Sequence, residues 1–153
     1  MQLSINRESL LKAINLIAKA ADKRHNMVIL GNIKLQLSEG ALILTASDLE
    51  VELTSTLKLP AGACIEAGTT TLPATKLRDI CKSLPSQAQV NLTTQENERC
   101  LLTSGKSRFT LGTLPSEDYP SLGNPENITP LTISRSRLTD LIHKTQFAMA
   151  IQD

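Results

Sequence analysis

Between three helix-like stretches, the chain alternates apolar and polar residues with a period of two. Short turns at residues 38–40, 96–98 and 104–106 separate several of the alternating runs. Such alternation is typical of antiparallel strands that bury one face and expose the other. The strands that it predicts cover residues 33–38, 41–45, 51–54, 57–59, 90–93, 100–103 and 108–111.

Helical spacing of apolar residues replaces this alternation in three places, and each follows a short predicted strand, at residues 3–5, 69–73 and 131–133. The predicted helices cover residues 7–24, 74–83 and 134–147. Asn6 and Ser134 precede the first and third helices and are residue types that cap helix N-termini, whereas Pro85 ends the second helix. The sequence therefore predicts three helices, each entered from a strand.

A strand, a helix and three further strands follow one another twice, and a third copy begins near residue 128. The copies start roughly 60–70 residues apart, a spacing that suits duplicated β-α-β-β-β units and is too long for a solenoid. Two such units predict a first domain over residues 1–122, followed by the end of a Pro- and Ser-rich linker at 123–127. Residues 128–153 are expected to be the start of a second, truncated domain, so the chain is expected to be a fragment.

A segregation of charge lies beneath a formal net charge of +1. The predicted helices carry eleven of the sixteen Lys and Arg residues but only four of the fifteen acids, a net +7 that leaves −6 for the rest. Basic helices on one face would hold a polyanion on one side, although a solvated helix surface is the plainer interpretation. No cluster of Asn or Gln accompanies the cations of the first helix, so nucleic-acid binding is expected to be independent of sequence.

No set of residues in the sequence has the arrangement of a catalytic site. Gly105-Lys106-Ser107 resembles the end of a phosphate-binding loop, but Cys100 stands where that motif requires glycine, and a hairpin turn explains the run. Cys81 and His143 could suggest a thiol nucleophile with a base, yet Cys81 shares the apolar register of its helix, as a buried thiol would. We therefore expect no enzymatic activity and no cofactor.

The patterns for metal binding and membrane insertion are also missing. Asp48, Glu50 and Glu52 alternate as a carboxylate cluster could, but a solvated strand face is the simpler explanation, and neither His25 nor His143 has Cys or His at metal-ligand spacing. Three widely spaced cysteines without a CxxC pair indicate reduced thiols in a cytoplasmic protein. No run approaches the length of a membrane span, and the N-terminus lacks a secretory signal.

Six short blocks then follow one another in a characteristic order. They are Ile29-Leu-Gly-Asn32, Leu44-Thr-Ala-Ser-Asp-Leu-Glu50, Ser104-Gly-Lys-Ser-Arg-Phe109, Thr113-Leu-Pro115, Asp118-Tyr-Pro120 and Thr145-Gln-Phe-Ala-Met-Ala-Ile-Gln-Asp153. With them, essentially the whole chain resembles the N-terminal part of the bacterial replicative sliding clamps, the β subunits of DNA polymerase III. The resemblance implies the α+β DNA-clamp fold: two β-α-β-β-β units with antiparallel sheet outside and helices on the inner face.

The resemblance also implies a function. Members of this family form head-to-tail rings of two three-domain subunits around duplex DNA, and they tether the replicative polymerase without reading sequence and without chemistry of their own. An ATP-driven clamp loader places the ring on DNA. The pocket that binds polymerase and loader peptides lies in later domains, so we expect it to be absent here.

Four residues are expected to contact DNA. Arg24 and Gln152 match by position residues that touch DNA in the family. Lys12 and Lys82 lie on the predicted helices that would line the hole, and they join the set because of their charge.

A further set matches the first-domain half of the family's subunit interface: Lys106, Arg108, Phe109 and Leu111 on one predicted strand, with Lys76 nearby. Phe109 and Leu111 are expected to supply apolar contact and the cations to pair with acids of the partner's third domain, a heterologous contact that closes into a ring. In this chain alone the strand should be an exposed edge. The alternative function is therefore a β-rich interaction module that pairs with partners through such edges.

Overall fold

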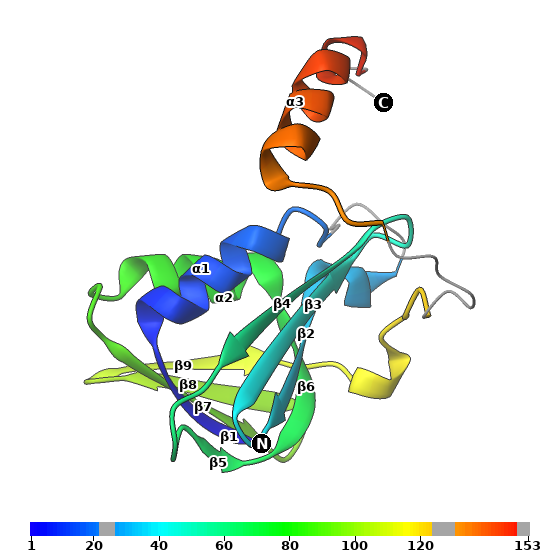
Figure 1. Cartoon of the computed structure of the whole chain (residues 1–153). Helices are drawn as coiled ribbons and strands as arrows, with labels where there is room; N and C mark the ends of the chain where they lie inside the picture. Colours follow the sequence, from blue (N-terminus) through cyan, green and yellow to red (C-terminus); the bar gives the residue numbers. More distant parts are fainter. Residues whose placement is uncertain (22–26, 124–130, 150–153) are drawn as a thin grey trace. The chain divides into compact units, whose positions relative to one another are not determined.

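The computed structural model describes residues 1–21, 27–123 and 131–149, and the chain divides into two compact units, Met1–Leu122 and Gly123–Asp153. The first unit contains most of the regular structure (Figure 1). Its elements are β1 (Gln2–Asn6), α1 (Arg7–Ile17), a 3₁₀ turn η1 (Val28–Gly31), β2 (Asn32–Ser38), β3 (Ala41–Ser47), β4 (Glu52–Lys58), β5 (Cys64–Glu66), β6 (Gly68–Pro73), α2 (Ala74–Ser83), β7 (Gln89–Gln95), β8 (Arg99–Ser104), β9 (Ser107–Gly112) and a 3₁₀ turn η2 (Ser116–Asp118).

The domain contains two antiparallel sheets, and each sheet takes strands from both repeats. One sheet has the order β5-β1-β7-β8-β9 and the other the order β4-β3-β2-β6. The first strand of each β-α-β-β-β unit therefore lies in the sheet of the other unit, because β1 pairs with β7 and β6 pairs with β2. The predicted duplication is confirmed, and this exchange of strands joins the two copies into one domain.

The sheet faces follow the predicted alternation. In β2, Ile33, Leu35 and Leu37 are buried on one face. On the neighbouring strand β3, Leu42 pairs with Leu37 and Leu44 pairs with Leu35, so both lie on that same face. Apolar side chains from both sheets and both helices form one core. The short strand β5 was not predicted, because three residues are too few to show a period.

Helices α1 and α2 lie side by side on one side of the sheets (Figure 1). Helix α1 contacts β3, β4 and α2, and α2 contacts β6. The side chain of Asn6 caps α1 as predicted, since its Oδ1 accepts hydrogen bonds from the amides of Glu8 (2.9 Å) and Ser9 (3.4 Å). The buried stripe of α1 consists of Leu10, Ala13, Ile14 and Ile17.

The first helix is shorter than predicted. It ends at Ile17 instead of continuing to residue 24, and residues 18–20 form a turn and a bend. The amide of Ala20 bonds the carbonyl of Ile17, which tightens the chain just beyond the last helical residue. Lys19 is therefore not part of the helix, and residues 22–26 lie outside the described residues.

In the second unit, the described regular structure is α3 (Arg135–Thr145) followed by a 3₁₀ turn η3 (Gln146–Ala148). The Oγ of Ser134 caps α3 as predicted, at 3.4 Å from the amide of Arg137. The strand predicted at residues 131–133 is wrong, because a strand needs a partner and this segment pairs with none among the described residues. Among those residues, no helix combines the length and apolar character that a membrane span requires.

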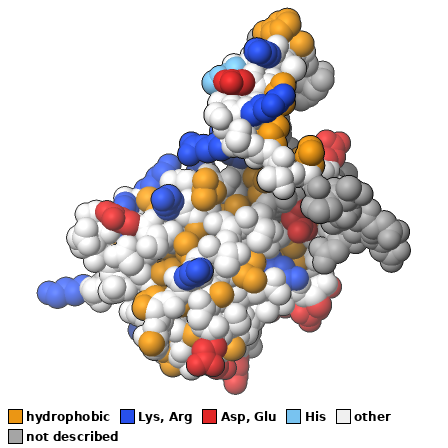
Figure 2. Space-filling model, viewed as in Figure 1, with side chains coloured by type: hydrophobic (Ala, Val, Ile, Leu, Met, Phe, Trp, Pro, Cys, Tyr) orange, Lys and Arg blue, Asp and Glu red, His pale blue; other side chains and the backbone are white. Residues whose placement is uncertain are grey.

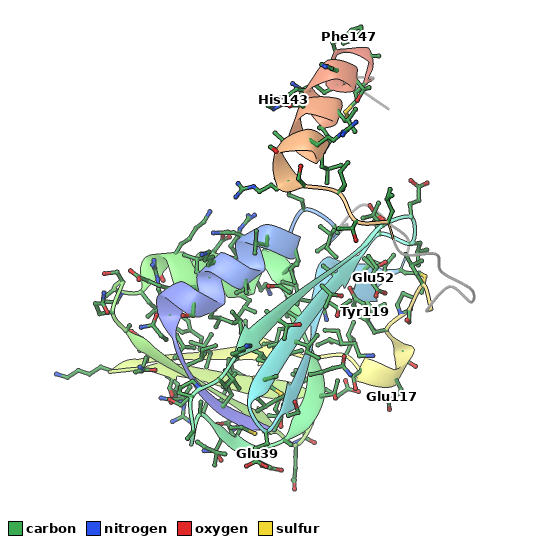
Figure 3. The ribbon with its side chains drawn as sticks, viewed as in Figure 1. Glu39, Glu52, Glu117, Tyr119, His143 and Phe147 are labelled. Carbon is green, nitrogen blue, oxygen red and sulfur yellow. The ribbon has the colours of Figure 1, made fainter. Side chains whose placement is uncertain are left out.

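A buried polar network fixes the segment that follows β9. The hydroxyl of Tyr119 accepts a hydrogen bond from the amide of Ser47 (3.1 Å) and donates one to the carbonyl of Asn32 (3.3 Å). The hydroxyl of Thr71 accepts a hydrogen bond from the side-chain amide of Asn32 (3.0 Å). It also donates to the carbonyl of Leu114 and accepts from the amide of Leu114, both at 2.9 Å. Burial raises the pKa of Tyr119, although the hydrogen bond from the Ser47 amide opposes this shift; the carboxylate of Glu52 (Figure 3) adds a smaller contribution in the same direction as burial.

Replacing Tyr119 with phenylalanine should test this network. The variant Tyr119→Phe leaves a buried amide and a buried carbonyl without their partner, so we expect the free energy of unfolding to fall by about 1–3 kcal/mol. Urea denaturation followed by circular dichroism measures the change. Thr56→Val, which removes an exposed hydroxyl from β4, is the matched control and should shift stability by less than about 0.5 kcal/mol. Equal stability of Tyr119→Phe and the native chain would contradict a stabilising role for the hydroxyl.

Candidate nucleic-acid interface

The two helices of the first unit carry the two predicted DNA contacts that the structure describes. Lys12 lies on α1 and Lys82 in the last turn of α2, and both side chains are exposed. The buried residues of α1 face the core, so Lys12 projects from the opposite side of the helix. No ion pair involves Lys12 or Lys82 within the described part of the chain.

The surface over these helices is basic. Figure 2 shows Lys and Arg side chains gathered over α1 and α2, whereas most of the acidic side chains seen on this unit lie along its lower and right-hand margins. A cationic surface of this kind attracts phosphates without reading bases. The segregation of charge predicted from the sequence is thus present on the folded unit.

Two of the cations on these helices already have protein partners. The guanidinium of Arg7, the first residue of α1, donates to the carbonyls of Cys81 (2.5 Å) and Lys82 (3.1 Å) at the end of α2. Arg78 lies 3.7 Å from the carboxylate of its neighbour Asp79. The predicted net charge of the helices therefore overstates the number of cations available to a ligand.

The other two predicted DNA contacts, Arg24 and Gln152, lie outside the described residues. They remain predictions that rest on the resemblance alone.

The predicted interface strand, β9, is at the edge of its sheet. Within the described residues it pairs only with β8, as expected. Arg108 is exposed and lies on the outer face, whereas Phe109 pairs with Leu102 on the inner face and is half-buried against the core. Leu111 is buried in the core and only 5% exposed, so little of its side chain is available for the apolar subunit contact that was predicted for it.

The structure places the two predicted interface lysines on different elements. Lys106 is exposed in the tight turn between β8 and β9, where Gly105 has a φ of 55° that favours glycine. Lys76 is exposed on the first turn of α2, and no hydrogen bond or ion pair connects it to β9 among the described residues. The hairpin turn also explains the Gly-Lys-Ser run without a nucleotide.

The thiol of Cys81 is buried, as its helical register predicts. Its exposed fraction is zero, and burial raises its pKa to about 11. Burial also raises the pKa of Cys100 to about 11. Because the thiolate is the reactive form, neither group has the properties of a nucleophile near neutral pH.

The acidic run at residues 48–52 is not one strand face. Asp48 lies in the turn before β4, where its Oδ1 accepts from the amides of Glu50 (3.0 Å) and Val51 (2.7 Å). These bonds lower the pKa of Asp48. The expected solvated strand is thus wrong for this segment, since the carboxylate closes a turn. Within the described residues, no three His, Cys, Asp or Glu side chains gather as metal ligands would.

Comparison with known proteins agrees with this arrangement. The family model for the N-terminal domain of the DNA polymerase III beta subunit matches residues 1–123. The beta sliding clamp of Haemophilus influenzae is 41% identical over 153 residues, and that of Escherichia coli is 40% identical; each match covers 100% of this chain and 41% of the relative. This chain thus spans well under half the length of these relatives.

Solved structures extend the comparison to the fold. A DnaN sliding clamp (DNA polymerase III subunit beta) from Pseudomonas aeruginosa, bound to griselimycin, matches with a TM-score of 0.92 and 41% identity, over 100% of this chain and 41% of that one. The pol III beta of Caulobacter crescentus matches with a TM-score of 0.91 and 31% identity, over 100% of this chain and 40% of that one.

The two antiparallel sheets with two helices on one side, together with the match to a solved sliding clamp, show that this domain has a DNA-clamp fold, and the predicted fold is confirmed. The chain belongs to the DNA polymerase III β-subunit family, through the family's N-terminal domain.

The burial of the two thiols predicts their reactivity. At pH 8, the native chain should react quickly with Ellman's reagent at Cys64, which is half-buried, and slowly at Cys81 and Cys100. In urea, all three thiols should react at similar rates. In a Cys64→Ala variant the fast phase should disappear, and fast reaction of a second thiol in that folded variant would contradict the described burial.

Proposed function

We propose that the chain is part of a sliding clamp that encircles DNA and confers processivity on the bacterial replicative DNA polymerase. The observation that carries the proposal is the pair of basic helices on one side of the two sheets, in a domain that belongs to the β-subunit family. Lys12 and Lys82 are proposed to face the phosphates, together with Arg24 and Gln152. Such contacts attract DNA of any sequence, which a sliding ring requires.

The partners follow from the same proposal. The complete protein would form a head-to-tail homodimeric ring, which a clamp loader opens and a polymerase binds in the cytoplasm. Lys76, Lys106, Arg108 and Phe109 would form one side of the subunit interface, with Leu111 supporting Phe109 from within the core. The open edge of β9 supports this role, because a sheet edge with unpaired backbone groups is suited to pairing with a strand of another subunit.

The domain limits are part of the proposal. Residues 1–122 would form the first clamp domain, 123–127 the end of the linker, and 128–153 the start of the second. The separation of the chain into units at Leu122 and Gly123 supports this division. The exposed apolar side chains of α3, Leu138, Leu141 and Ile142, suit a helix whose sheet lies in a later part of a longer chain.

DNA binding by the 153-residue chain tests the proposal. We expect weak, sequence-independent binding to a linear 30-base-pair duplex, since 153 residues that span 41% of a relative's length are too few to close a ring around it. Plots of log affinity against log salt should have a negative slope, and Lys12→Gln and Lys82→Gln should each reduce its magnitude by about 0.9. Fluorescence anisotropy between 20 and 150 mM salt gives the slopes.

The matched control is Lys58→Gln, which removes an exposed cation from the end of β4 and should leave the slope unchanged. Absence of salt-dependent binding to the duplex would instead favour the interaction module that pairs through edge strands. Tight, sequence-selective binding at physiological salt would rule out sliding.

A further inference from the structure

Arg7 occupies a position where a helix does not favour a cation. It is the first residue of α1, beside the positive end of the helix macrodipole, where acids such as Glu8 are favoured instead. Arg7 also continues the buried stripe of α1, at a spacing of three from Leu10 and seven from Ile14. Its side chain is half-buried at the N-terminal end of that stripe. The local sequence of α1 gives no reason for an arginine here.

The C-terminal end of α2 supplies the reason. Helices leave their last carbonyls without partners, and many end with a left-handed residue that satisfies them. Here the C-cap residue Leu84 is extended (φ −81°, ψ 153°), and the following Pro85 has no N–H to donate. Side chains take over this role: Ser83 Oγ bonds the carbonyl of Ile80 at 2.8 Å, and Arg7 bonds the next two carbonyls.

We infer that Arg7 is a positioning residue that sets the register of α1 against α2, and that it does not contact phosphate. Its two side-chain bonds hold the end of α2, and its own amide bonds the carbonyl of Ala88 beyond that helix at 2.9 Å. One residue of the first repeat therefore ties down the helix and the following loop of the second. A guanidinium at a helix C-terminus is also favoured by that helix's macrodipole.

This register fixes the spacing of the proposed DNA contacts, so the inference rests on the proposed function. Lys82 carries one of the carbonyls that Arg7 holds, while its own ammonium is exposed. Lys12 lies five residues after Arg7, about 7.5 Å further along the helix axis. Arg7 thus sets the position of the Lys12 ammonium on α1 relative to the Lys82 ammonium on α2, because it holds the backbones of the two helices together.

Nuclear magnetic resonance on the 153-residue chain tests the cap directly. In the native chain, the Arg7 Nε–H should exchange slowly with solvent, and the carbonyl ¹³C shifts of Cys81 and Lys82 should report the hydrogen bonds. Arg7→Gln and Arg7→Lys should both shift these carbonyl resonances and weaken the nuclear Overhauser contacts between α1 and α2. Lysine keeps the charge but lacks the planar fork that reaches two carbonyls. Unchanged carbonyl shifts and inter-helix contacts in both variants would overturn the inference.

DNA titrations separate positioning from phosphate contact. If Arg7 positions the helices, both variants should bind the duplex 3- to 10-fold more weakly, with the salt slope of the native chain. Lys12→Gln is the control that lowers the slope by about 0.9. If Arg7 contacts phosphate, Arg7→Gln lowers the slope similarly and Arg7→Lys restores it, which would overturn the inference. A native chain with no salt-dependent binding would refute the proposed function, and the resonance data would still decide whether Arg7 sets the helix register.

Discussion

The exchange of first strands between the two β-α-β-β-β units is the constraint on which the rest of the first domain depends. Because β1 completes the sheet of the second unit and β6 that of the first, each sheet is continuous only when both units are folded. Each helix directly follows an exchanged strand. The exchange therefore brings α1 and α2 together, with the start of α1 beside the end of α2, where Arg7 meets the carbonyls of Cys81 and Lys82.

This arrangement sorts the cations of the helices by role. Arg7 uses its guanidinium to cap a neighbouring helix, and Arg78 pairs with Asp79. Lys12 and Lys82 remain exposed on the surface that the helices share. Exposed ammonium groups interact with phosphates weakly and over a range of positions, whereas an arginine fork binds in a fixed geometry. On these two helices, Arg7 and Arg78 are therefore held by protein partners, and the exposed ammonium groups of Lys12 and Lys82 are left for a ligand.

Much of the fold could be predicted because it depends on local pattern. Period-two alternation identified the longer strands, and the limits of α2 agree with the predicted range. Strand exchange could not be predicted, since pairing between distant segments has no local signal. The early end of α1 and the unpaired segment at residues 131–133 were missed because helical spacing and β propensity continue past the point where packing partners end. For the candidate site, the sequence predicted Lys12 and Lys82, and the structure places both at exposed positions on the two helices. The role inferred for Arg7 depends on its contacts with α2, and its only sequence signal is a cation at the N-terminus of a helix.

The exchanged strands also suggest how such a domain could have arisen. A single β-α-β-β-β unit of about half the domain has a three-stranded sheet whose open edge needs one more strand, and it carries a first strand that its own sheet does not use. Two identical copies would satisfy both requirements by swapping these strands, giving a symmetric homodimer with two helices on one side. Gene duplication and fusion would then convert that dimer into a single chain without changing its strand pairing. The pairing of β1 with β7 and of β6 with β2 is the trace that such a history would leave in the present domain.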